Sequence, residues 1–272
     1  MLALLATALI GTYSGHPVLV TGRTPLQATL QASALPGNGA HFEIREQANG
    51  TTVRAYDLNM TKRLHLILVS DDMRTFRHLH PTLHPDGRFT LDVAPAPAGL
   101  YHVYIDGDPH GSGRQVFRFD VPLGSAKPAA VRVANPPGAT AHAGPYEVRL
   151  DRTTVDPGDI TTIHVTILKN GRPAPDLHPY LGGMAHGVFI GMRDLAYMHT
   201  HGMSAEMLAM SDQSDCGDSM MTTMPALAPN ASVPPAFLLQ VLAPSAQPYD
   251  FWLQFRGGST VYTVPFLVSA SP

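Results

Sequence analysis

The chain contains very little cysteine, tryptophan and charge. Its 272 residues include one Cys and one Trp, and Asp, Glu, Lys and Arg together make up only 14%. The single Cys216 excludes an internal disulfide framework and any zinc motif built from paired cysteines. The formal net charge is −3, with no basic stripe that could neutralise phosphates. We therefore expect no nucleic-acid partner.

Long apolar runs and helix-period segments are also missing. The longest apolar run, MLALLATALIG at the N-terminus, is too short to span a bilayer and suits the apolar region of a signal peptide. We predict that residues 1–21 are a signal peptide or an uncleaved N-terminal anchor. The protein is then exported to the periplasm, the cell surface or the medium, and it is membrane-anchored if the segment is retained. The alternatives are a misassigned start codon and a buried apolar strand.

Proline and glycine are abundant instead, with 25 and 24 residues, and hydrophobic residues make up 44%. This composition is typical of packed cores made of short strands joined by turns. Residues 22–40 are small and polar and predict a tether, and residues 125–145 are rich in Pro, Ala and Gly and predict a linker. Short alternating runs fill residues 41–124 and 146–270. We predict an all-β chain of two tandem immunoglobulin-like (cupredoxin-like) β-sandwich domains.

The two halves repeat one pattern of histidines. When Met60–Pro81 is placed over Leu181–Gly202, a shift of 121 residues (181 − 60), the 22 aligned positions share only three identities. All three are histidine, although ancestry alone would also have kept core Leu, Val or Gly. The matched pairs are His65 with His186, His78 with His199, and His80 with His201.

An insertion distinguishes the second half. Phe89–Tyr101 aligns with Phe237–Tyr249 at a shift of 148 (237 − 89), so the second half holds 27 additional residues (148 − 121). They fall at about 204–231, a segment that contains Cys216 and many methionines among Ser, Asp and Gly. This composition does not suit a core and predicts a loose, copper-collecting loop.

The spacing of each triad predicts a binding site on a hairpin. Residues two apart on a strand share a face, so His78 and His80 point the same way. A hairpin that turns near residues 71–73 brings His65 across from them. It lies opposite His80 if the register centres on Asp72–Met73, and opposite His78 if the register centres one residue pair earlier. In both registers the three imidazoles can converge on one ion at about 2.0–2.1 Å per bond.

The donor set narrows the choice of metal. Neither triad includes a carboxylate, which disfavours calcium and magnesium, or a thiolate, which disfavours a closed structural zinc site. Three imidazoles alone suit copper, zinc or nickel. Met184 and Met203 each lie two residues from a second-half histidine, and soft thioethers there favour Cu(I). We predict copper, as Cu(I) or Cu(II), with zinc as the alternative metal and core packing as the alternative role of both methionines.

The chain resembles a bacterial family of exported, tandem β-sandwich proteins labelled YtkA-like, copper-resistance-like or heavy-metal-binding. The resemblance covers residues 42–268 or so, and its most specific stretches are H-L-H-P and P-Y-L-G, within LHLILVSDDMRTFRHLHP and GRPAPDLHPYLGGMAHGVFIGMRDLAYMHTHG. It implies an immunoglobulin- or cupredoxin-like fold and a role in copper or heavy-metal handling. The chain departs from the family at Gly202, where the family usually has proline, and at the Met-rich insertion.

The expected function is an exported copper-binding protein that stores, delivers or gives resistance to copper, with one three-histidine site per domain. Its partners are the metal ion and another copper-handling protein. We expect no enzymatic activity. A cupin-like metal-dependent oxygenase is the enzyme alternative, because His199, His201 and Glu206 match part of a cupin motif, but the first half lacks that Glu. The third possibility is a structural or interaction β-sandwich module with incidental or zinc-binding histidines.

Overall fold

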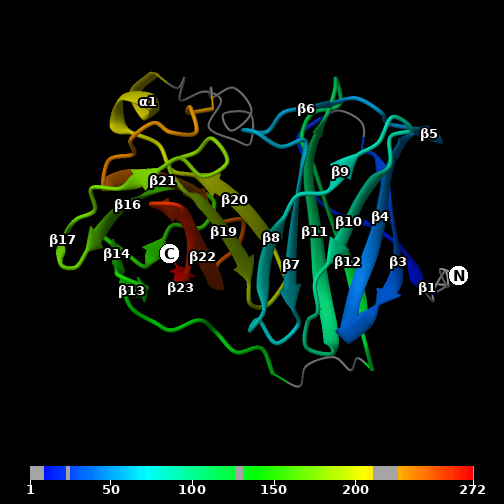
Figure 1. The fold of residues 1–272 in the computed structure, drawn as a ribbon, viewed down its shortest axis with the longest axis horizontal. Helices are drawn as coiled ribbons and strands as arrows, with labels where there is room; N and C mark the ends of the chain where they lie inside the picture. Colours follow the sequence, from blue (N-terminus) through cyan, green and yellow to red (C-terminus); the bar gives the residue numbers. More distant parts are fainter. Residues whose placement is uncertain (1–8, 23–24, 126–130, 211–225, 272) are drawn as a thin grey trace, which may run out of the picture. The chain divides into compact units, whose positions relative to one another are not determined.

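The computed structural model describes residues 9–22, 25–125, 131–210 and 226–271. The chain divides into two compact units, Met1–Val133 and Ala134–Pro272. Each unit is a β-sandwich of two largely antiparallel sheets, and helix is confined to short segments (Figure 1). The predicted fold class, all-β with two tandem sandwich domains, is confirmed.

The first sandwich packs two six-stranded sheets face to face. One has the order β1-β3-β4-β10-β9 with β5 beside β4, and the other has the order β2-β12-β11-β7-β8 with β6 beside β11. The strands are β1 Leu9–Ser14, β2 His16–Val20, β3 Gln27–Leu35, β4 Gly39–Ala48, β5 Thr51–Thr52, β6 Tyr56–Asp57, β7 Leu64–Ser70, β8 Phe76–Leu79, β9 Thr82–Leu83, β10 Phe89–Val93, β11 Gly99–Pro109 and β12 Gln115–Leu123, and the short 3₁₀ turn η1 is Pro36–Asn38.

Alternation of side chains produces the core of this unit. Along β4, Phe42 and Ile44 are buried, whereas Glu43 between them is partly exposed. The facing sheet contributes inward residues of β7, β11 and β12, among them Leu66, Val103 and Phe119. His65 lies between two core residues of β7, so its side chain points to the opposite face of the sheet, because successive side chains point to opposite sides.

The N-terminal segment differs from the prediction. Leu9–Ser14 and His16–Val20 are strands that pair with β3 and β12, but their described residues are partly or fully exposed, not buried as the strand alternative supposed. Residues 1–8 lie outside the described part. The tether predicted for 22–40 is wrong, because Gln27–Leu35 is a strand with Ala28, Leu30 and Ala32 buried. Small residues typical of a tether here fill the space between two sheets. Within the described residues, no helix is long and apolar enough to cross a membrane.

The predicted linker is shorter than residues 125–145. Residues 126–130 lie outside the described part of the chain. On one side, the backbone N–H of Val133 donates to the Asp72 carbonyl at 3.0 Å, and on the other, the N–H of Asn135 donates to Asp250 Oδ1 at 2.7 Å. Thr140–Ala143 already forms strand β13 of the second unit. The Ala-rich end of the segment is therefore part of a sheet. Its pairing with β14 determines its structure there more than its amino-acid composition does.

The second sandwich repeats the arrangement. One sheet has the order β13-β14-β16-β17 with β21 beside β16, and the other has the order β15-β23-β22-β19-β20 with β18 beside β22. The elements are β13 Thr140–Ala143, β14 Tyr146–Leu150, β15 Thr154–Val155, β16 Ile160–Lys169, β17 Arg172–Pro173, β18 Leu177–His178, β19 His186–Gly191, β20 Tyr197–His201, α1 Ala205–Met210, β21 Ala236–Leu242, β22 Pro248–Gly257 and β23 Thr260–Ala270. Of the predicted insertion, residues 211–225 with Cys216 lie outside the described part.

One carboxylic acid sits inside the first core. Glu46 continues the inward row of Phe42 and Ile44 on β4 and is fully buried. Burial raises the pKa of Glu46 to about 7, a shift that the Tyr56 hydroxyl opposes and the charge of Asp106 reinforces. A raised acid pKa means that the folded state retains a proton which the unfolded chain releases. Ionisation of Glu46 therefore opposes folding.

We predict that Glu46→Gln changes the free energy of unfolding of the first unit more favourably at pH 8 than at pH 4. The expected difference between the two pH values is about 3 kcal/mol, from a rise of roughly 2.5 in the pKa at 1.36 kcal/mol per unit. In the native protein, the contribution of Glu46 is most favourable below pH 4.5 and is lost as pH rises through about 7. Denaturant unfolding across this range measures the difference. Glu43→Gln, on the other face of β4, is the control, and an equal response of both variants to pH would contradict the assignment.

Candidate metal centre

Two hairpins position the two histidine triads. In the first unit β7 pairs with β8, with Ile67 opposite His78 and Leu66 opposite Leu79, so continuing the register puts His80 opposite His65. In the second unit β19 pairs with β20, and His186 lies opposite His201. Of the two predicted registers, both hairpins adopt the one that sets the first histidine across from the third.

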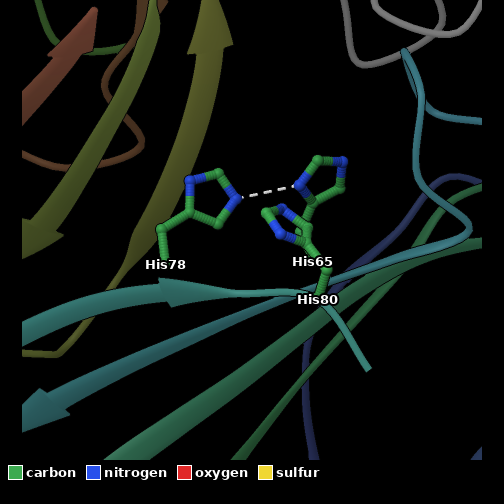
Figure 2. Close-up of side chains that lie close together, drawn as sticks. All are labelled: His65, His78 and His80. Atoms are coloured by element: carbon green, nitrogen blue, oxygen red, sulfur yellow. Dashed lines mark hydrogen bonds between the residues drawn. The ribbon is translucent and has the colours of Figure 1, made fainter. Parts of the chain in front are cut away.

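The three rings of the first triad converge. His65 Nδ1 lies 2.9 Å from His78 Nε2, and one ring nitrogen from each of the three residues can be chosen so that all lie within 4.8 Å of one another (Figure 2). Ring centroids are 4.8–5.1 Å apart. Two nitrogens bound to one tetrahedral ion at about 2.0–2.1 Å are separated by about 3.3 Å. The observed spacing is therefore close to that of a chelate.

The second triad has the same contact between the same atoms. His186 Nδ1 lies 3.2 Å from His199 Nε2. The His201 ring is 4.4 Å from that of His186 and 4.8 Å from that of His199, between centroids. All three residues are buried. The structure thus brings the rings of each predicted triad together, but of the two predicted triads in the described residues only the first offers one nitrogen per ring all within 4.8 Å.

A tight turn before each hairpin fixes the orientation of the first ring. Asn59 and Lys62 exchange backbone hydrogen bonds of 2.8 and 3.1 Å, and the Asn59 carbonyl also lies 3.3 Å from His65 Nε2. In the second unit Tyr180 and Gly183 exchange bonds of 2.9 and 3.0 Å, and the Tyr180 carbonyl lies 2.9 Å from His186 Nε2. A carbonyl only accepts, so Nε2 carries the proton in both rings. Nδ1 then presents its lone pair to the neighbouring imidazole.

These turns contain backbone strain at equivalent positions. Met60 has φ 56° and Leu181 has φ 52°, in the left-handed region that non-glycine residues seldom occupy. Such conformations persist only where the surrounding structure determines them, and they cluster at functional sites. The sequence comparison missed both turns, because the two segments share no identity and act through backbone atoms. The signal available in the sequence was the equal spacing, because Asn59 and Tyr180 each lie six residues before the first histidine of their triad.

Burial favours the neutral form of two imidazoles of the first triad, those of His65 and His80. Burial lowers the pKa of His65. The pKa of His80 falls to about 2, through burial first and then through the neighbouring His78 and His65. His80 Nε2 is buried and has no hydrogen-bond partner among the described residues. A neutral nitrogen with no protein partner is a ready ligand, because a metal binds the unprotonated form.

The two methionines occupy different surroundings. Met184 belongs to the hydrophobic core of the second sandwich and is buried, so packing accounts for it, and we leave it out of the proposed ligands. Met203 is also buried, and its backbone exchanges hydrogen bonds of 3.0 and 2.9 Å with Leu238. Glu206, which the cupin alternative requires, is exposed on α1 and joins no metal-capable group in the described part of the chain.

The fold and the two sites define a tandem β-sandwich protein with a repeated histidine cluster. The chain matches the model of a family described as a domain of unknown function, DUF8832, over residues 21–123 and 140–272, and it belongs to this family. The two matched segments are consistent with the tandem arrangement. A comparison with curated proteins gives no match.

Two solved structures show distant likeness. The chain is similar to the structure of titin A168169 at 9% identity and a TM-score of 0.21, with 95% of this chain and 100% of that chain covered. It is also similar to domains 4 and 5 of the S-layer protein SbsC at 10% identity and a TM-score of 0.22, with 97% and 100% covered. Neither likeness assigns a function to the histidines.

We predict that His65 and His186 share one tautomer in the metal-free protein. Long-range ¹H–¹⁵N NMR at pH 7 should show both rings neutral with the proton on Nε2, because a carbonyl accepts from that atom in both units. The exposed His110 is the reference for a ring outside the triads. A proton on Nδ1 of either ring would contradict the proposed orientation of its lone pair.

Proposed function

We propose that this protein is an exported copper-binding protein that stores or delivers copper or gives resistance to it, with one three-histidine site per domain. The observation that carries the proposal is the repeated constellation: a carbonyl holds Nε2 of the first histidine, and its Nδ1 faces Nε2 of the second. Unrelated packing of histidines in two units would not produce the same contacts between the same ring atoms in both. A histidine held by a carbonyl on one nitrogen and aimed at an ion with the other is a common metal-ligand arrangement.

Copper is favoured by the donors. Both triads are composed of imidazoles alone, which disfavours hard cations that require oxygen ligands. Met203, which is buried and lies two residues after His201 in the sequence, is the candidate soft donor for the second triad and favours Cu(I) there. The resemblance to YtkA-like and copper-resistance-like proteins supports the same choice, although the DUF8832 family description names no metal. Zinc is the competing metal, since it also binds three imidazoles.

Export is supported by the same resemblance and by the apolar N-terminal run, whose last residues, Leu9–Gly11, belong to strand β1. The chain begins MLALLATALIG, and the expected location is the periplasm, the cell surface or the medium. Fractionation of cells that produce the full chain tests this proposal. Recovery of the protein in the cytoplasmic fraction alone would contradict it.

We predict that the purified untagged protein binds two copper ions per chain. Replacing His186, His199 and His201 with Ala should leave one ion, and replacing all six triad histidines should leave none at micromolar free copper, because each site loses every proposed ligand. Metal analysis after dialysis and isothermal titration measure the stoichiometry.

The matched control replaces His41, His110 and His164, which lie outside both triads. This variant should still bind two ions. Equal copper loading of the control and the six-histidine variant would show that binding is adventitious. If the protein instead binds two zinc ions in preference to copper, the proposed metal is wrong and the proposed sites are right.

A further inference from the structure

A buried ion pair lies beside the first triad. Asp106 on β11 is the cross-strand partner of His65 on β7, so the two side chains share a face of the sheet. The Asp106 carboxylate accepts from Arg114 Nε at 2.7 Å and from Arg114 Nη2 at 2.6 Å. Both side chains are almost fully buried, at 1% and 2% exposure. A bidentate guanidinium of this kind keeps the carboxylate ionised.

The second triad has no such charge at the equivalent place. There the cross-strand partner of His186 on β22 is Gln254. Gln254 carries no charge, and its amide donates from Nε2 to the neutral hydroxyl Oγ1 of Thr263 at 3.1 Å. The two sites therefore offer the same imidazoles but differ in the charge at one neighbouring position.

Asp106 lies nearer to the first triad than its partner Arg114 does. Asp106 is on β11, which pairs directly with β7, whereas Arg114 directly precedes β12, which pairs with β11 on the side away from β7. The negative charge is therefore the closer of the two to the triad, and the pair favours positive charge there. Interaction with a fixed charge scales with the charge of the ion, so a divalent ion gains about twice as much as a monovalent one.

We propose that Asp106, held in place by Arg114, is a specificity-determining residue that biases the first triad towards the divalent state of its ion relative to the second triad. This inference rests on the proposed copper-binding function. The two sites of one chain then differ in redox preference, with the first favouring Cu(II) and the second Cu(I). A buried ion pair adds little net stability, which is consistent with its being retained for such a role.

The test measures the ratio of Cu(II) to Cu(I) affinity at the first triad alone. The background is the full chain with His186, His199 and His201 changed to Ala, and chelator competition is run for each oxidation state. Asp106→Asn should reduce the ratio by about tenfold, because it removes the negative charge beside the triad and keeps the positive charge of Arg114. Asp106→Asn with Arg114→Met removes both charges and should reduce the ratio by less, about threefold.

The double variant also tests the inference if the single variant does not fold, because it removes the buried cation together with the buried anion. Asp92→Asn, an exposed carboxylate on the other sheet, is the charge-matched control and should leave the ratio unchanged. An unchanged ratio in the folded Asp106 variants overturns the inference but not the copper site. If the background chain binds neither form of copper, the proposed function itself fails, and the inference fails with it.

Discussion

The hydrogen bond from the first histidine of each triad to a backbone carbonyl determines what the site can do. His65 donates Nε2–H to Asn59, and His186 donates the same proton to Tyr180. Without this bond the ring could rotate or change tautomer, and Nδ1 would carry the proton instead of a lone pair. Since the acceptor is a main-chain atom in a strained turn, side-chain substitutions in that turn can accumulate without loss of the arrangement.

The sandwich supplies the other requirement, which is a rigid and largely dry frame. The hairpin strands present alternate residues to the core and to the opposite face. Leu64 and Leu66 therefore pack in the core, while His65 between them points to the face on which the triad lies. Burying imidazoles in this setting favours their neutral form. In the second unit, Phe189 of the hairpin strand β19 stacks on Phe251 of β22, with 4.0 Å between ring centroids, and both belong to the core. Each site is therefore held by the core of its own domain.

Local pattern predicted much of this, and its failures have physical causes. The triads, the hairpins and one of the two registers follow from period-two spacing and from the repeat. The strands at 9–14 and 16–20 were not predicted because the segment begins with an apolar run typical of a signal peptide. The strand at 27–35 was not predicted because small residues look like a tether until a sheet partner is known. Asp106 could not be linked to His65 from the sequence, because 41 residues (106 − 65) separate the two positions and only the β7–β11 pairing joins them. Met184 looked like a ligand by spacing but is a core residue.

X-ray absorption spectroscopy of the copper-loaded protein tests the central claim most directly. Our account predicts that copper is bound mainly by imidazole nitrogens at about 2.0 Å, with the outer-shell scattering that histidine rings produce. The spectrum should keep this signature in the variant that retains only His65, His78 and His80. A spectrum dominated by oxygen ligands, without imidazole scattering, would show that the two triads are not the copper sites.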